Sequence, residues 1–317
     1  MKDIYIYILK LIFVFIIIGC LIRVCFLSEF YGNDILQIKT EILKSSKTEY
    51  NLIFVGSSKT YRHINTLRLN RKLDKAYKSF NIGSPGTFSP ELVYVLSNIL
   101  YNPIFDSFEN IIIEADPNVL LAEENISSVK YKYYSSLNIL NYLLKTYLNT
   151  STRTDLRNFK RHSISYFYRI MNFNLISEII THTKSSDNDL REVLIEKDGY
   201  LSLQNQVNLL NSNGLRKRRE ITFGKPKVKN KRKANKVYLE KLYYFSNKFR
   251  TKGKNLVFID KSNFLNNDPN LRIIDMEQVD SLIPFNKTYY FDKGHYTNKG
   301  SNRYTDILYK KLLYVLQ

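Results

Sequence analysis

The chain has 317 residues, 44% of them hydrophobic, which is enough to bury one sizeable core. Disordered proteins and small disulfide scaffolds are therefore poor matches. The formal net charge is +19, and both cysteines, Cys20 and Cys25, lie near the N-terminus, so the rest of the chain offers neither a disulfide nor a thiolate metal site.

The N-terminal segment is apolar on every face. Between Ile4 and Leu27 only Lys10 and Arg23 interrupt the apolar run. A membrane helix needs about 20 apolar residues, and long basic side chains near its ends can reach the interface. We therefore expect a single membrane anchor over residues 1–28.

Two features bear on the orientation and processing of this segment. Lys2 makes the short N-terminus basic, which favours a cytoplasmic N-terminus and places the body outside the cytoplasm. Residues 17–20, Ile-Ile-Gly-Cys, are similar to the lipid-attachment site of bacterial lipoproteins, in which a lipidated Cys20 would start the mature protein. Because the residues after Cys20 stay apolar, we favour a single-pass anchor in a bacterial cell membrane, followed by a juxtamembrane segment over residues 29–49.

A basic stretch carries much of the positive charge. Between Arg216 and Lys236, eleven basic residues accompany one acid, Glu220, so this stretch contributes +10 of the +19. Gly224 and Pro226 and the scarcity of apolar residues indicate an exposed loop. The plain interpretation is a solvated loop; the functional one is contact with anionic lipid or an acidic glycan. We expect no nucleic-acid partner for an extracytoplasmic domain.

Further along the chain, four short apolar runs, each followed by polar turn residues, predict buried strands. They are residues 51–55, 79–82, 110–114 and 255–260. Segments with helical spacing alternate with them, at residues 90–100, 234–250 and 299–316. This alternation predicts one α/β domain over residues 50–317, with helices on both faces of a parallel sheet.

Tyrosine-rich sequence with helical spacing interrupts this alternation. We expect it to form a helical insertion, a lid or side lobe, at about residues 122–233. In parallel sheets, ligands bind beyond the carboxyl ends of the strands, so the residues that follow each strand are the first candidates for a site. These residues are Ser57, Ser58, Gly83, Ser84, Asp116 and Asn118.

Ser58 and the pair Asp292 and His295 are the residues that could carry chemistry. A serine hydroxyl becomes nucleophilic when a histidine takes its proton and a carboxylate orients that histidine. Ser58 follows a predicted strand and a glycine, and Asp292 precedes His295 by three residues. Taken singly, Ser58 is also explained as a helix cap and the pair as a surface feature. His63 could line the same mouth, although a solvated or capping histidine is the simpler interpretation.

Together these residues resemble the SGNH/GDSL hydrolase superfamily, in its membrane-anchored cell-envelope branch. That family has a Gly-Asp-Ser-like block near the first strand and an Asp-x-x-His block near the C-terminus. The resemblance implies that Ser58 is the nucleophile, with Ser57 in place of the usual aspartate. It implies that Asp292 orients His295, the general base, in a flavodoxin-like three-layer fold.

The resemblance also implies an oxyanion hole that begins with the amides of Ser58 and Gly83. The third family block, Gly-x-Asn-Asp, has no clean match in residues 114–118. Asp116 cannot donate a hydrogen bond unless it is protonated, which leaves Asn118 as the candidate third donor.

The function that the resemblance implies is acyl transfer or deacylation at the cell surface. We expect an extracytoplasmic serine esterase or O-acyltransferase that acts on acyl groups, acetyl first among them, of a cell-surface polysaccharide. This chemistry needs no cofactor and no metal. The alternative is a catalytically weak or inactive membrane-tethered scaffold in polysaccharide assembly, which a Ser58–His295 separation above about 6 Å would favour.

Overall fold

The computed structural model describes most of the chain outside the middle region. The described residues are 2–26, 30, 33–87, 89–115, 134, 136–150, 153–170, 188–203, 236–265, 268–292 and 294–316. The chain divides into two compact units. The first consists of Met1–Gln37 and Leu121–Ser186, and the second of Ile38–Leu120 and Asp187–Gln317.

The first unit is helical where it is described. It contains α1 (Lys2–Phe26), α8 (Leu137–Thr150) and α9 (Arg153–Ile170). The last two fall within the predicted insertion, and their helical character agrees with the expected spacing. Within the described part of the chain, no helix combines the length and the apolar character needed to cross a membrane. The predicted anchor over residues 1–28 therefore has no support from the structure.

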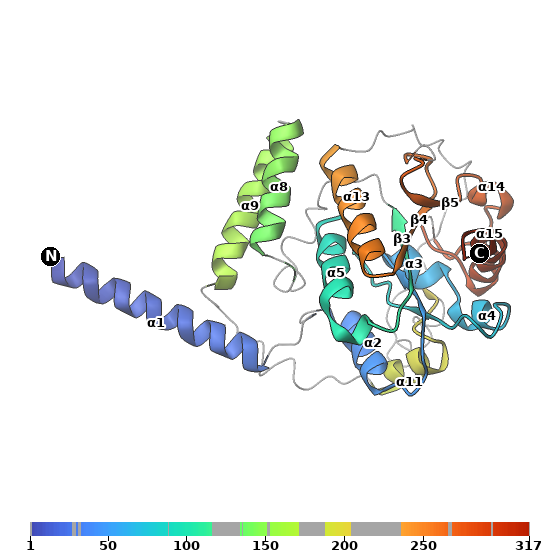
Figure 1. The fold of residues 1–317 in the computed structure, drawn as a ribbon, viewed down its shortest axis with the longest axis horizontal. Coiled ribbons are helices and arrows are strands. Elements are labelled where there is room, and N and C mark those ends of the chain that lie inside the picture. The colour runs from blue at the N-terminus through green and yellow to red at the C-terminus, as the bar shows by residue number, and fades with distance from the viewer. Residues whose placement is uncertain are drawn as a thin grey trace. The chain divides into compact units, whose positions relative to one another are not determined.

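The second unit is built on a five-stranded sheet in which every pair of neighbouring strands is parallel (Figure 1). The order β2-β1-β3-β4-β5 is one of the two common orders of doubly wound α/β folds. The strands are β1 (Leu52–Val55), β2 (Ser79–Asn81), β3 (Asn110–Ala115), β4 (Asn255–Asp260) and β5 (Arg272–Asp275). The predicted parallel α/β sheet is thus confirmed, with one strand more than expected.

The fifth strand was not predicted because it lacks a continuous apolar run. In β5 only Ile274 is buried, while Arg272 and Asp275 are exposed at the edge of the sheet. The central strands differ, since Leu52 and Phe54 on β1 are fully buried, as is Ile53 between them. Burial of both faces explains why β1 has an apolar rather than an alternating sequence.

Helices cover both faces of the sheet (Figure 1). One layer contains α5 (Ser89–Tyr101) and α13 (Lys236–Thr251), and the other α3 (Ser58–His63), α4 (Thr66–Asn70) and α15 (Asn298–Leu316). The second layer packs through Leu69, Leu308 and Leu312 onto Phe54 and Val257 of the sheet. Shorter elements are α2 (Asp34–Ser45), which belongs to this unit from Ile38 onward, η1 (Pro103–Phe105), α11 (Asn188–Glu196) and α14 (Val279–Leu282).

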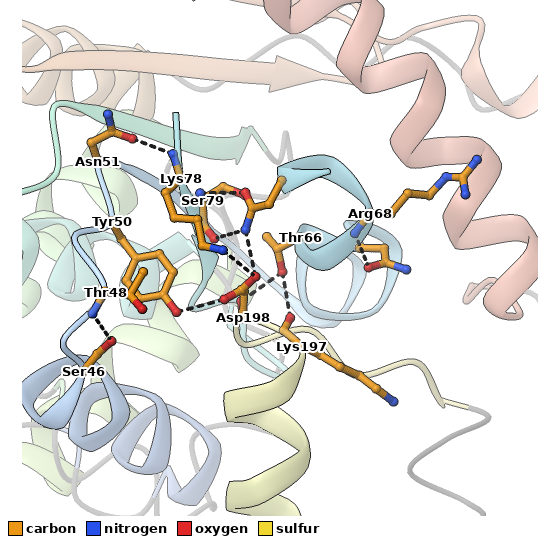
Figure 2. Close-up of polar contacts among 12 residues, drawn as sticks. Ser46, Thr48, Tyr50, Asn51, Thr66, Arg68, Lys78, Ser79, Lys197 and Asp198 are labelled. Carbon is orange, nitrogen blue, oxygen red and sulfur yellow. Dashed lines mark hydrogen bonds and ion pairs between the residues drawn. The ribbon is translucent and has the colours of Figure 1, made fainter. Parts of the chain in front are cut away.

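The turn after α11 covers the outer edge of β2. The Asn81 backbone N–H donates to the Asp198 carbonyl at 2.9 Å, and Asp198 has a left-handed φ of 48°. The Asp198 carboxylate accepts a hydrogen bond from Tyr50 Oη at 2.9 Å, and Lys78 Nζ lies 3.8 Å from it (Figure 2). It also accepts a hydrogen bond from Asn70 Nδ2 at 2.8 Å. An uncovered edge strand would expose unpaired backbone groups. The Asp198 turn therefore protects β2 and fixes the end of the strand next to the candidate site.

Candidate active site

The turn after β1 places Ser58 at the start of a helix. Ser57 is the N-cap of α3, and its Oγ accepts a hydrogen bond from the Lys59 amide at 3.3 Å. At Gly56 a Cβ atom would lie 2.2 Å from Thr60 Oγ1, so the tight turn requires glycine. Ser58 is the first residue of α3, and its backbone N–H has no partner among the described residues. The predicted strand before Ser58 is observed, and a helix begins at Ser58 itself.

Asp292 and His295 lie in a tight turn before α15. A single bridge between Tyr290 and Tyr296 closes this turn, and the Phe291 N–H donates to the His295 carbonyl at 2.9 Å. Asp292 Oδ1 accepts hydrogen bonds from the amides of Gly294 and His295 at 2.7 and 2.8 Å. The same carboxylate thus stabilises the turn and faces the imidazole.

The structure brings Ser58, His295 and Asp292 into one hydrogen-bonded chain. His295 Nδ1 lies 2.9 Å from Asp292 Oδ2 and 3.0 Å from Oδ1, and His295 Nε2 lies 3.1 Å from Ser58 Oγ. The carboxylate accepts only, so the hydrogen belongs on Nδ1, and Nε2 is left to accept the Ser58 hydroxyl. This is the arrangement in which an imidazole can take the proton of an attacking serine.

The Asp292 carboxylate is held in its charged form. Burial works to raise the pKa of Asp292, but hydrogen bonds from the His295 ring and from the Gly294 and His295 amides outweigh it and lower the pKa below its usual value. The Asp292 side chain is 39% exposed and that of His295 25%. The pair is thus at a partly open position, where a substrate can reach it.

The Gly83 amide differs from its predicted role as an oxyanion donor. It donates to the Asn81 Oδ1 at 2.8 Å, and a Cβ atom at Gly83 would lie 2.6 Å from the Tyr61 nitrogen. The neighbouring Ser84 amide donates to the Gly56 carbonyl at 3.0 Å. Asn81 terminates β2, and its short side chain folds back onto the loop that follows. The amide expected to face an oxyanion is therefore occupied within the protein.

The buried Lys39 side chain binds the same loop at the Gly83 carbonyl. Lys39 on α2 has no exposed surface, and its Nζ donates to the Gly83 carbonyl at 2.6 Å. The ammonium also lies 3.9 Å from the centroid of the Tyr61 ring, a cation–π contact. Burial, and next the nearby Arg62 guanidinium, lower the pKa of Lys39 well below its usual value. The backbone N–H and the carbonyl of Gly83 thus both have partners within the protein.

Two residues without a predicted role, Glu114 and Lys261, lie beside the turn that leads from β1 into α3. Glu114 Oε2 accepts hydrogen bonds from Thr60 Oγ1 at 3.0 Å and from Ser57 Oγ at 3.3 Å. Lys261 Nζ lies 3.4 Å from Glu114 Oε1. No motif marks these residues in the sequence. The available signal was a charged residue, Glu114, near the end of the buried strand β3, where apolar residues are the norm. Lys261 directly follows β4, where a polar residue is expected, so it gave no signal.

His63 is buried rather than solvated. It is 3% exposed, its ring centroid lies 4.1 Å from that of Tyr296 and 6.1 Å from that of His295. Burial, followed by the charge of Lys261, lowers the pKa of His63 well below its usual value. The interpretation of His63 as a solvated or capping residue is wrong, because its helix packs against α15. His63 is a neutral imidazole behind His295.

Some predicted features lie outside the described residues. These are Asp116 and Asn118, hence the third oxyanion donor, and the basic stretch apart from Lys236, which begins α13. Comparison of the chain with protein-family models, with curated proteins and with solved structures gives no match.

Proposed function

We propose that the chain is an extracytoplasmic serine esterase or O-acyltransferase of the SGNH/GDSL type. Its substrates would be acyl esters, acetyl esters first among them, on a cell-surface polysaccharide. The observation that carries this proposal is the 3.1 Å separation between Ser58 Oγ and His295 Nε2. A separation above about 6 Å would have favoured a scaffold without chemistry.

The proposed reaction proceeds through an acyl-enzyme. Ser58 Oγ attacks the ester carbonyl while His295 Nε2 takes the hydroxyl proton, and Asp292 stabilises the imidazolium that forms. The tetrahedral intermediate collapses as the bond from the acyl carbon to the sugar oxygen breaks, and His295 gives its proton to that oxygen, which leaves as a sugar hydroxyl. Water or a second sugar hydroxyl then attacks the acyl-enzyme. His295 takes the proton of this attacking group and returns a proton to Ser58 Oγ as the acyl bond breaks. Water gives hydrolysis, and a sugar hydroxyl gives transfer.

The fold is consistent with this type of enzyme. The proposed nucleophile follows β1, an interior strand of a sheet with the order 2-1-3-4-5, and the pair Asp292 and His295 precedes the last helix. Both lie at the carboxyl end of the strands, where ligands bind in doubly wound sheets. The proposal also keeps the single membrane anchor over residues 1–28 and an α/β domain that begins at residue 50.

Covalent labelling tests the proposed nucleophile. A fluorophosphonate probe should label the full-length protein, and the label should disappear in Ser58→Ala. Ser262→Ala removes a hydroxyl that follows β4 at the same end of the sheet and, among the described residues, donates only to Asp260, so this variant should label like the wild type. Absence of label on the wild type, or label that persists in Ser58→Ala, would exclude Ser58 as the nucleophile.

Product analysis tests the substrate class. The wild type should release acetate from p-nitrophenyl acetate and from an O-acetylated polysaccharide. In the presence of an unacetylated polysaccharide, acetyl transfer would appear as ester on the acceptor. Failure on both esters in a protein that fluorophosphonate labels would retain the nucleophile but exclude acetyl esters.

The weak or inactive scaffold remains a second candidate because of one observation. The Gly83 amide donates to Asn81, so the Ser58 amide is the one predicted oxyanion donor that is free within the described part of the site. Loss of one such donor costs an enzyme about 10²–10³ in kcat. A scaffold predicts that Ser58→Ala leaves surface-polysaccharide assembly in cells unchanged, whereas the enzyme predicts that the same variant abolishes the acyl modification.

A further inference from the structure

The turn that carries the proposed nucleophile, residues 56–60, is called the nucleophile turn below. One carboxylate contacts it on both sides of Ser58. The two hydroxyls that donate to Glu114 Oε2, those of Ser57 and Thr60, stand on either side of Ser58 in the sequence. Ser57 is the N-cap of α3, and Thr60 is in its first turn. The position of Ser58 is therefore fixed from both sides by a single oxygen atom of Glu114.

The register of the sheet accounts for this placement. Val55, the last residue of β1, pairs with Ile113, so Glu114 lies one residue further along, beside Gly56. A Cβ atom at Gly56 would lie 3.3 Å from Glu114 Cβ. On the other side of β3, Ala115 pairs with Asp260, which brings Lys261 to the same edge. Three neighbouring parallel strands thus bring the nucleophile turn, the carboxylate and the ammonium together.

Lys261 keeps the carboxylate charged in a poorly solvated position. The side chains of Glu114 and Lys261 are only 10% and 18% exposed, and the ammonium also lies 4.5 Å from the ring centroid of Tyr304. Burial works to raise the pKa of Glu114, but Lys261, then Lys59 and the Thr60 hydroxyl, outweigh it and lower the pKa below its usual value. An ionised carboxylate accepts hydrogen bonds without donating any, as two hydroxyl donors and an ammonium require.

We propose that Glu114 is a positioning residue for the nucleophile: held by Lys261, it fixes Ser57 and Thr60 and thereby directs the Ser58 hydroxyl at His295. This inference rests on the proposed function, since a positioning residue needs a nucleophile to position. In the family that the sequence resembles, an aspartate usually stands at the position of Ser57. Here the carboxylate beside this turn would come from Glu114 instead.

Steady-state kinetics of three variants test the role of the pair. Glu114→Gln keeps the size of the side chain but offers one acceptor oxygen, and its amide hydrogens face either Lys261 or the hydroxyls. We expect kcat to fall about 10–100-fold with KM nearly unchanged, because a small misplacement of a nucleophile slows the chemical step. Lys261→Met should also lower kcat, because it leaves a buried charge without its partner. The double variant should lose less than the product of the two single losses.

The matched control is Glu41→Gln. Glu41 also pairs with a cation, Arg191, at 2.8 Å, but its side chain is 56% exposed and belongs to α2. This variant should keep the wild-type kcat. Thr60→Val provides a milder change if Glu114→Gln does not fold, because it removes one of the two hydroxyl donors and keeps the shape of the side chain.

A distance measurement makes the inference testable without turnover. In crystal structures, the separation between Ser58 Oγ and His295 Nε2 should lengthen beyond about 3.5 Å in Glu114→Gln or Thr60→Val. A Ser58–His295 hydrogen bond that persists in a folded variant would overturn the positioning role, and so would a wild-type kcat in an active enzyme. A wild type that neither labels nor turns over would instead count against the proposed function, and the distance would then show only whether Glu114 orients the Ser58 side chain.

Discussion

Asn81 Oδ1 accepts the Gly83 backbone N–H at 2.8 Å, and the same Asn81 side chain donates through Nδ2 to the carbonyls of Thr60 and Ile64 at 2.9 and 3.0 Å. One fully buried amide thus links the loop after β2 to α3, the helix that begins at Ser58. The family resemblance assigns the Gly83 N–H to the oxyanion hole, but in the structure this N–H donates to the Asn81 side chain. The fixed spacing between α3 and the loop is the result.

Asn81→Ala should be strongly destabilising. It removes three hydrogen bonds and leaves the Gly83 amide and the Thr60 and Ile64 carbonyls buried without this partner. We expect a loss of about 2–4 kcal/mol in the free energy of unfolding, since each orphaned buried group costs about 1–3 kcal/mol and the site relaxes in part. Urea unfolding measures it. Asn98→Ala, which removes one bond to Tyr94 within α5, should cost less than about 1 kcal/mol.

Asp292→Asn should separate orientation from folding. The amide oxygen of asparagine can still accept the turn amides, but its NH₂ group cannot accept the His295 Nδ1–H, so the imidazole adopts the other tautomer. If the three residues act as a catalytic triad, kcat should fall about 10⁴-fold, with little change in stability. The measurement is ester hydrolysis alongside a thermal unfolding curve. Asp275→Asn, an exposed carboxylate on β5, serves as the control and should keep the wild-type kcat; equal losses in both variants would argue against a triad.

The parts of the fold that could be predicted from the sequence are those fixed by short-range pattern. The buried runs of β1, β3 and β4 are apolar because both faces of these strands are covered, and each is followed by a recognisable turn. Ser58, Asp292 and His295 could be found for a similar reason, because each lies in a local pattern that also occurs in a known family. These three residues could be identified without knowing the distances between them.

The parts that could not be predicted depend on long-range packing. Whether the Gly83 amide is free depends on the rotamer of Asn81, and no spacing rule specifies it. Glu114 and Lys261 meet only because β3 and β4 pair in one particular register. The residues around His63 in the sequence do not show whether its side chain is buried or exposed. It is buried because α3 packs against α15. Register, rotamer and helix packing are properties of the whole fold.

An ion pair between α4 and α15 should make stability depend on acid pH. Asp306 accepts two hydrogen bonds from Arg68 at 2.7 Å each and lies 2.9 Å from Lys72 Nζ. The hydrogen bond from Arg68 is the main reason that the pKa of Asp306 is lowered in the folded protein, against the opposing effect of partial burial. A carboxyl of this kind stabilises the fold fully above its unfolded pKa of about 3.9, and the contribution is lost as the pH falls through the lower folded value.

We therefore expect Asp306→Asn to lower the free energy of unfolding by about 0.5–1 kcal/mol at pH 7. The difference from the wild type should shrink as the pH falls below about 4, where the unfolded carboxyl begins to bind protons. Urea unfolding at a series of pH values measures this. Asp74→Asn, which alters an exposed carboxylate that accepts a hydrogen bond from the Lys75 amide, should have a smaller effect at pH 7. A difference for Asp306→Asn that stays constant down to pH 3 would show that the ion pair is not its source.

Gly56→Ala should damage the nucleophile turn more than the fold. The added methyl would lie 2.2 Å from Thr60 Oγ1, so Thr60 must rotate away and give up its hydrogen bond to Glu114. Overpacking of this kind costs about 1–3 kcal/mol in the free energy of unfolding. Because Thr60 flanks Ser58, kcat should fall as well in the variant that remains folded.

Gly253→Ala is the matched control for this prediction. Gly253 has a left-handed φ of 71°, and no atom lies within 4 Å of a Cβ atom placed there. Its substitution should cost about 1 kcal/mol through backbone strain alone and leave kcat unchanged. Urea unfolding and ester hydrolysis, measured on both variants, separate the two effects. If Gly56→Ala kept the wild-type kcat, the turn would tolerate displacement of Thr60, and the orientation of Ser58 would not depend on the contacts that Thr60 makes.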